Sequence, residues 1–278
     1  MIEEAIFSCQ KNSSLITANI YFCIFAICKT SVLNKNIMTV NLFVSCIIDQ
    51  FYPMTAMNTM KLLRAAGVEV EYNPEQTCCG KFAFHSGYVD ESRALGEKFL
   101  RDFPGIRPVV GLSASCVGFI KTKYKELFYN TSLHLEYKRL VGNIFELTDF
   151  LVNQLHRDYF DAVFHHKAAY LDSCSSLREL GLKNEGRLLL SKVNGLELVE
   201  LRHPEICCGF GKGLFALQHE AISSSLADQK LHDAISSGAE YLITNDISCL
   251  LHLDAYAKKQ NLPIKIIHIA DVLTEGWE

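Results

Sequence analysis

The chain has 278 residues and a net charge of -4, and 49% of its residues are hydrophobic. This length fits one large domain or two small ones with a buried core. The balanced charge provides no basic surface for nucleic acid or anionic membrane. Eleven cysteines are the unusual feature. They are too dilute for a disulfide-rich miniprotein and favour a reducing, cytoplasmic setting where thiols serve metal or redox chemistry.

Residues 1–37 are predicted to be an extension outside the fold. Their apolar run, from Leu15 to Cys28, is shorter than the ~17–25 residues that cross a bilayer, so no integral membrane span is expected. An apolar strand follows directly after Met38, where the folded protein is expected to begin. On this interpretation Cys9, Cys23 and Cys28 carry no role.

From Met38 onward, apolar strands alternate with helices twice along the chain. In the first half, strands are predicted at 40–44, 68–72 and 109–112, and helices at 55–66, 89–103 and 117–127. In the second half, strands are predicted at 168–171, 196–201, 241–244 and 264–268, and helices at 187–192, 218–237 and 250–260. A helical connection near 137–158 joins the halves. Such alternation predicts an α/β fold of two tandem, similar Rossmann-like halves with mostly parallel sheets.

Eight of the cysteines form an internal repeat. In the first half they are Cys46, the pair Cys78-Cys79 followed by Gly80, and Cys116. Their counterparts are Cys174, Cys207-Cys208 followed by Gly209, and Cys249, at offsets of 128, 129 and 133 residues. Repetition at a fixed period indicates two copies of one structural unit. The predicted boundaries are 38–135 and 166–278 for the two cysteine-rich domains, with 136–165 as the connection.

The single cysteine at each end of a repeat follows a predicted strand and precedes a predicted helix. Ligands of open parallel sheets bind beyond the carboxyl ends of the strands, where helix N-termini point. Positive helix ends lower a thiol's pKa, and an iron–sulfur cluster held by four thiolates is an anion suited to this place. The residues alone leave open buried apolar cysteines, structural zinc, whose closely spaced pairs are absent, and redox disulfides. No dinucleotide or P-loop motif is present.

The repeated pattern resembles the cysteine-rich CCG domain. That domain occurs in the cysteine-rich subunit of heterodisulfide reductase, in the iron–sulfur subunits of glycolate oxidase and anaerobic glycerol-3-phosphate dehydrogenase, and in the lactate utilization protein A family. The resemblance to the last family is close from Met38 to the C-terminus. It is carried by Phe51-Tyr52-Pro53, Gln76-Thr77-Cys78-Cys79-Gly80, His85-Ser86-Gly87-Tyr88, Leu177-Arg178-Glu179-Leu180-Gly181 and Cys207-Cys208-Gly209-Phe210-Gly211.

The resemblance implies an iron–sulfur electron-transfer subunit of a complex that oxidises L-lactate, a small 2-hydroxy acid, to pyruvate. It implies an oxidoreductase subunit that does not act alone, with partners resembling lactate utilization proteins B and C and no nucleic acid. It assigns no catalytic residue. Carried over by motif, the metal ligands are Cys46, Cys78, Cys79 and Cys116 for one cluster, and Cys174, Cys207, Cys208 and Cys249 for the other.

Several positions depart from related sequences. Heterodisulfide reductase has a fifth cysteine in each repeat where this chain has Phe119 and His252, so two 4Fe-4S clusters are the simpler expectation. Lys81 stands where the family usually has Gln, and Lys212 stands where relatives have Gly. Kinship with heterodisulfide reductase leaves open a cluster-dependent thiol–disulfide enzyme. A glycolate oxidase iron–sulfur subunit and a zinc-stabilised assembly module are further alternatives.

Overall fold

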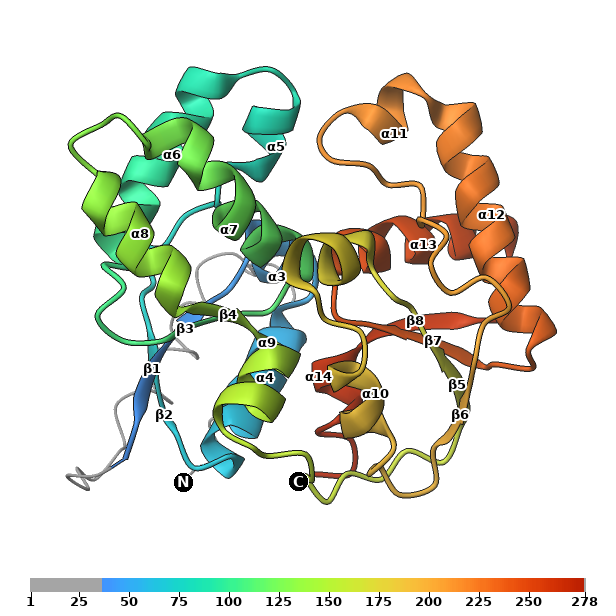
Figure 1. Cartoon of the computed structure of the whole chain (residues 1–278). Coiled ribbons are helices and arrows are strands. Elements are labelled where there is room, and N and C mark those ends of the chain that lie inside the picture. Colours follow the sequence, from blue (N-terminus) through green and yellow to red (C-terminus); the bar gives the residue numbers. More distant parts are fainter. Residues whose placement is uncertain (1–36, 278) are drawn as a thin grey trace, which may run out of the picture.

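The computed structural model of the protein describes residues 37–277, and the predicted extension therefore lies almost entirely outside the described residues. The chain forms two four-stranded sheets with the orders β2-β1-β3-β4 and β6-β5-β7-β8. Every strand pair in both sheets is parallel. Figure 1 shows the two sheets side by side, each with its own helices. The predicted α/β fold with two similar halves is thus confirmed.

The first half alternates strands and helices as the apolar pattern predicts. Its strands are β1 (Thr39–Phe43), β2 (Glu69–Tyr72), β3 (Val109–Gly111) and β4 (Ile144–Glu146). Its helices are α3 (Cys46–Phe51), α4 (Pro53–Ala65), α5 (Lys81–His85), α6 (Val89–Asp102), α7 (Ala114–Phe128), α8 (His134–Asn143) and α9 (Leu147–Asp149), followed by the π-helix η1 (Phe150–Gln154).

The second half repeats this order. Its strands are β5 (Lys167–Tyr170), β6 (Glu197–Val199), β7 (Tyr241–Thr244) and β8 (Lys265–His268). Its helices are η2 (Ser176–Leu180), α10 (Glu185–Leu190), α11 (Phe215–Gln218), α12 (Glu220–Ser236), α13 (Ile247–Gln260) and α14 (Ile269–Val272).

The segment between the halves is less regular than a helical connection. Helix α8 ends at Asn143, and the next three residues form β4, which pairs in parallel with β3 and completes the first sheet. Ile144 and Glu146 are fully buried, so packing against the sheet decides the local structure. No strand is predicted there from the sequence, because three residues are too short for a visible alternation.

One apolar core crosses from the first half into the second. It includes Val40 and Leu42 of β1 together with Ile243 of β7, all fully buried. Helix α4 contacts α14 between the two sheets (Figure 1), and Asp271 of α14 accepts hydrogen bonds from Thr55 at 2.8 Å and Asn58 at 2.9 Å. The halves are therefore joined by buried contacts that hold the carboxyl ends of both sheets in a fixed relation.

None of the helices in residues 37–277 combines the length and apolar character needed to cross a bilayer.

Candidate functional site

The four predicted cysteines of the first half lie together beyond the carboxyl ends of β1, β2 and β3. Cys46 begins α3, Cys116 lies in the first turn of α7, and Cys78-Cys79 are separated from α5 only by its N-cap residue, Gly80. The sulfur atoms of Cys46 and Cys78 are 3.7 Å apart. Further thiol contacts join Cys78 to Cys79 and Cys79 to Cys116. All four side chains thus gather in one place, which we call the first quartet.

The second quartet has the same construction. Cys174 follows β5, Cys207-Cys208 lie within the loop between β6 and α11, and Cys249 lies in the first turn of α13. The sulfur atoms of Cys208 and Cys249 are 3.1 Å apart. Contacts join Cys174 to Cys207 and Cys207 to Cys208. The two sets of cysteines lie about 130 residues apart in the sequence. Within each set, the fold brings the four side chains together.

None of the eight cysteines in the described residues forms a disulfide. The inner members Cys79, Cys116, Cys208 and Cys249 are buried, whereas Cys46 is exposed.

The last cysteine of each repeat lies inside the first helical turn and not before it. In the second half this follows because Asp246 caps α13, accepting from the backbone N–H of Ser248 at 2.8 Å, so the helix begins earlier than its apolar pattern suggests.

Each Cys-Cys-Gly loop is held by the same local contacts. Gly80 and Gly209 have φ angles of 85° and 92°, which only glycine adopts without strain. Their carbonyls accept hydrogen bonds from Ser92 at 3.1 Å and Ser223 at 2.8 Å. Their N–H groups donate to the sulfurs of Cys78 and Cys207, both at 3.4 Å. A side chain at Gly209 would lie 2.5 Å from the carbonyl oxygen of Ser223, so the loop requires glycine there.

The first quartet contains two thiols with lowered pKa values. Hydrogen bonds from Cys46 and Cys79, aided by the Gly80 N–H and the Lys81 charge, lower the pKa of Cys78 to about 3. A hydrogen bond from Cys79 lowers the pKa of Cys116 against the effect of burial, and Lys81 again contributes. The donors Cys46 and Cys79 have raised pKa values for the same reason. The surroundings of Cys78 and Cys116 therefore shift both thiols toward the thiolate form.

In the second quartet the pKa values of all four thiols are raised. A hydrogen bond from Cys208 lowers the pKa of Cys249, but burial and the Asp246 charge raise it to about 11. The pKa of Cys174 is raised by its hydrogen bond to Cys207 and by burial. The pKa values of Cys207 and Cys208 are also raised. The two copies of one motif thus present different electrostatic surroundings.

Lys81 lies between the two quartets and accounts for part of this difference. It is 6% exposed, and its Nζ donates to Ser115 at 2.6 Å and to Ser248 at 2.9 Å. These serines directly precede Cys116 and Cys249, and their hydroxyl oxygens are 3.1 Å apart. Burial opposes the charge of Lys81, but the charges of Cys116 and Asp246 outweigh it and raise the pKa. A buried ammonium therefore bridges the two serines that precede the last cysteine of each copy.

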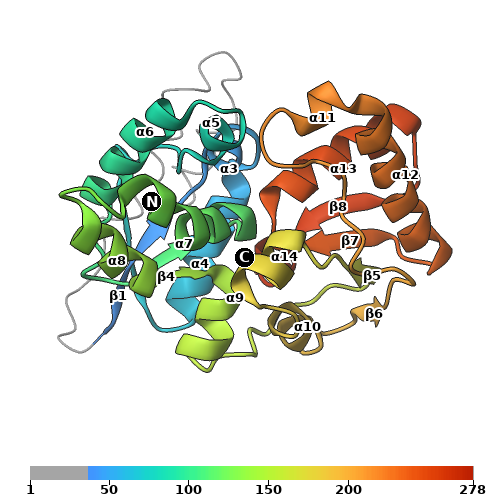
Figure 2. The ribbon, with the colours of Figure 1, turned by 45° about the horizontal axis from the view of Figure 1, so that its top comes forward.

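Backbone contacts at the same point tie the helix starts together. The N–H of Ala114, at the start of α7, donates to the carbonyl of Asn245 at 3.1 Å. Ser115 also donates to Asp246 at 3.0 Å. Figures 1 and 2 both show α7 and α13 meeting near the centre of the molecule. Lys81 was singled out in the sequence as a departure next to the cysteines, but its serine partners carry no sequence signal.

His252 lies at the edge of the site, and His166 lies away from it. His252 is half-buried, its Nε2 lies 3.2 Å from the Ser223 hydroxyl, and its ring packs against Phe210. Its repeat counterpart Phe119 is buried against Phe84. His166 lies 2.8 Å from Glu240 at the far side of the second sheet. None of these contacts joins a histidine to a thiol.

The donor set fits a thiolate-bound cofactor. Each quartet offers four free thiols, two of them buried, together with backbone N–H groups directed at sulfur. A structural zinc ion draws four ligands to about 2.0–2.3 Å of one point. Within residues 37–277, no three His, Cys, Asp or Glu side chains are placed to hold a single metal ion. The two quartets are therefore the residues that could hold a metal or a metal cluster through thiolates.

Comparisons with known proteins agree with this geometry. The cysteine-rich domain family CCG matches residues 40–121 and 168–254. Lactate utilization protein A 2 of Bacillus cereus is 35% identical over 240 residues, which cover 86% of this chain and 99% of that protein. Lactate utilization protein A of Geobacillus kaustophilus is 39% identical over 237 residues, 85% of this chain and 98% of that protein.

A solved structure of a hypothetical protein from Helicobacter pylori has the same fold. It superposes with a TM-score of 0.55 at 10% identity, over 95% of this chain and 54% of that one. At this identity the likeness concerns the fold alone. The domain match and the sequence relatives go further, because they span both cysteine-rich halves: the chain belongs to the lactate utilization protein A family of proteins with tandem cysteine-rich CCG domains.

Proposed function

We propose that this chain is an iron–sulfur electron-transfer subunit of a complex that oxidises L-lactate to pyruvate. The observation that carries the proposal is the gathering of eight free cysteines into two quartets of equal construction. The names of the relatives, lactate utilization protein A, supply the metabolic context. Cys46, Cys78, Cys79 and Cys116 would hold one 4Fe-4S cluster, and Cys174, Cys207, Cys208 and Cys249 the other.

When bound, such clusters accept and release single electrons. The chain's own residues would bind them and set their surroundings. The thiolates supply negative ligands, and the Gly80 and Gly209 N–H groups donate to sulfur. Lys81 adds a positive charge between the two quartets. Hydrogen bonds and net charge near a cluster raise or lower its reduction potential.

The surroundings of the quartets also limit access of water. Tyr124 and Phe119 are nearly fully buried, and the Tyr124 hydroxyl donates to the Cys79 carbonyl at 3.0 Å. Cys46, by contrast, is exposed, and Cys174 is partly exposed. Each quartet is thus buried on its inner side and open on its outer side. A partner subunit could approach the open side, which suits a protein that passes electrons between other molecules.

The test uses the anaerobically reconstituted chain together with partner proteins of the lactate utilization B and C classes. L-lactate should reduce the clusters of this chain, as seen by EPR, only when the partners are present, and pyruvate should appear in proportion. Cys46→Ser and Cys174→Ser should each abolish electron flow. Iron-free protein that sustains full lactate oxidation in the same mixture would contradict the proposal.

A further inference from the structure

Ser45 carries a buried hydroxyl group directly before the first cysteine of the first quartet. The residue is 1% exposed, and its Oγ atom forms no hydrogen bond with any described residue. Buried polar atoms in folded proteins almost always have a partner. A serine hydroxyl has one proton to donate and can rotate to direct it at an acceptor. The surroundings of Ser45 indicate what that acceptor is.

Helix capping does not explain this hydroxyl. Ser45 is the N-cap residue of α3, a position at which a serine oxygen usually accepts a hydrogen bond from a backbone N–H of the first turn. The Ser45 side chain makes no such bond. Its counterpart in the repeat, Ser173, accepts from the backbone N–H of Ser176 at 3.1 Å. The two copies of the Ser-Cys sequence therefore differ, because only Ser173 has a partner in the chain.

The direction of β1 places the Ser45 side chain on the side of the quartet. Successive side chains of an extended strand point to opposite faces of the sheet. Phe43 packs in the core cluster that contains Cys79 and Cys116. Val44 packs in the other core cluster, which crosses between the halves. The backbone of Ser45 is still extended, with φ of -68° and ψ of 153°, so its side chain lies on the same face as Phe43 and the two buried thiols.

No thiol of the first quartet accepts the Ser45 proton. The sulfur atoms of Cys46 and Cys78 are 3.7 Å apart, and the Gly80 N–H donates to the sulfur of Cys78 at 3.4 Å. The acceptor that suits this face is the inorganic core that the four cysteines would hold, because the sulfurs of such a core accept hydrogen bonds.

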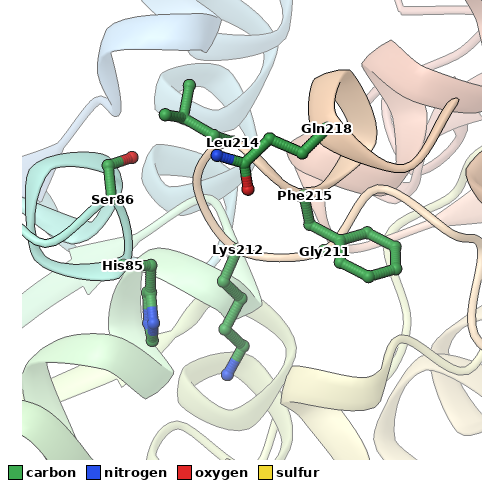
Figure 3. Close-up of a pocket in the computed structure, with 7 residues that line it drawn as sticks. All are labelled: His85, Ser86, Gly211, Lys212, Leu214, Phe215 and Gln218. Carbon is green, nitrogen blue, oxygen red and sulfur yellow. The ribbon is translucent and has the colours of Figure 1, made fainter.

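The other unpartnered side chains near the quartets have a different explanation. His85 and Ser86 line a pocket of about 360 Å³ between α5 and the loop that leads into α11 (Figure 3). A water molecule takes about 30 Å³ in the liquid, so this pocket has room for water that bonds to both residues. Figure 3 shows the His85 ring and the Ser86 hydroxyl extending in different directions, which does not suit one shared ligand. Ser45 does not line this pocket.

We propose that Ser45 is a positioning residue of the first cluster and that its hydroxyl donates a hydrogen bond to a sulfur of the core held by the first quartet. The inference rests on the proposed function, because it requires an iron–sulfur core at that place. Such a bond stabilises the reduced cluster, which is the more negative state, more than the oxidised cluster. Ser45 therefore raises the reduction potential of the first cluster.

A potentiometric EPR titration of the full, cluster-loaded chain tests this inference with Ser45→Ala. The signal of the first cluster is the one that persists in Cys174→Ser and is lost in Cys46→Ser. Loss of the hydroxyl should make reduction of this cluster about threefold to tenfold less favourable, which lowers its potential by about 30–60 mV at 59 mV per tenfold change for one electron. Ser45→Thr keeps the hydroxyl and should keep most of the wild-type potential.

The repeat supplies the controls. The potential of the second cluster should be the same in Ser45→Ala and in the wild type. Ser173→Ala, which changes the matching position of the second half, should leave the potential of the first cluster unchanged. The iron content of Ser45→Ala should equal that of the wild type, because no ligand is removed. A first-cluster potential that is equal in Ser45→Ala and the wild type, or that falls equally in Ser173→Ala, would overturn the inference.

Proton ENDOR of the reduced protein in H₂O and in D₂O gives a second, direct readout. The first cluster of the wild type should show a coupling to an exchangeable proton that is missing in Ser45→Ala. The coupling from the Gly80 N–H should remain in both proteins. Identical exchangeable couplings in the two proteins would show that the Ser45 hydroxyl does not bond to the cluster.

The outcome is separable from that of the proposed function. Two reducible clusters whose potentials and proton couplings do not respond to Ser45→Ala would overturn this inference alone. A first cluster that responds to Ser45→Ala, in a protein that takes no electrons from lactate with its partners, would overturn the role in lactate oxidation and leave the inference in place. Protein that assembles no cluster at the first quartet would overturn both.

Discussion

Glu146 should make the stability of this protein depend on pH between about 4.5 and 8. It ends β4, is fully buried, and its Oε2 accepts hydrogen bonds from the backbone and hydroxyl of Thr148 at 2.8 and 2.5 Å. Its Oε1 has no partner within the described residues. Burial raises its pKa from 4.5 to about 8, although the hydrogen bonds from Thr148 and Asp149 oppose the change.

The direction follows from proton binding. Below pH 4.5 the carboxyl is protonated in both the folded and the unfolded chain, so its neutral form is buried without a charge penalty. Above that pH the unfolded chain ionises first, and stability falls until the folded carboxyl also ionises near pH 8. At about 1.4 kcal/mol per pKa unit, the shift of 3.5 units from 4.5 to about 8 corresponds to roughly 5 kcal/mol in total, of which about 3 kcal/mol is lost by pH 7.

Glu146→Gln removes this titration and keeps the shape of the side chain. Urea unfolding of both proteins at several pH values should show a stability difference that grows in favour of the variant by about 1.4 kcal/mol per pH unit between pH 5 and 8. Glu275→Gln, at an exposed position near the C-terminus, is the matched control and should give a profile parallel to the wild type. A Glu146→Gln profile that also runs parallel to the wild type would refute the reasoning.

Three further changes test other parts of the structure. Arg187→Met leaves the buried Asp172 carboxylate without the guanidinium that contacts it at 2.7 and 2.8 Å, and should lower the free energy of unfolding in urea by about 3–5 kcal/mol. Asp172→Asn in the same chain should recover much of this loss. A loss of stability below about 1 kcal/mol in Arg187→Met would contradict the importance of the pair. Gly118→Ala would place a Cβ against the Glu179 carboxylate and should lower the melting temperature. Gly142→Ala, where a Cβ meets open space, is the control and should raise the free energy of unfolding by about 0.5–1 kcal/mol. Equal changes of melting temperature in the two variants would mean that the halves pack more loosely at α7. Lys81→Met removes the charge between the quartets and should lower the reduction potentials of bound clusters in a potentiometric EPR titration, so unchanged potentials would show that this charge does not act on them.

Much of the fold follows from local sequence patterns. Strands such as β1 and β7 are short apolar runs, and α6 is an amphipathic run with Asp90 and Glu91 in its first turn. Each of these elements is therefore visible from its own residues. The gathering of the cysteines is also predictable in outline, because the repeat places equivalent residues at equivalent strand ends of two similar units.

The contacts between the halves could not be predicted in this way. Lys81 and Ser248 are 167 residues apart, and only the packing of α7 against α13 brings them within 2.9 Å. The close contact of Gly118 in α7 with Glu179 likewise depends on how η2 lies against α7. No local periodicity encodes such a relation, so the buried lysine emerges only from the folded molecule.

The most direct test of the central claim is the metal and sulfide content of anaerobically purified protein, in the wild type and in variants with one quartet broken. Wild-type protein should contain iron and acid-labile sulfide in equal amounts. Cys46→Ser and Cys174→Ser should each retain about half of both, and the remaining EPR signals should differ between the two variants. Zinc in place of iron, or full iron content in both variants, would contradict the assignment of one cluster to each quartet.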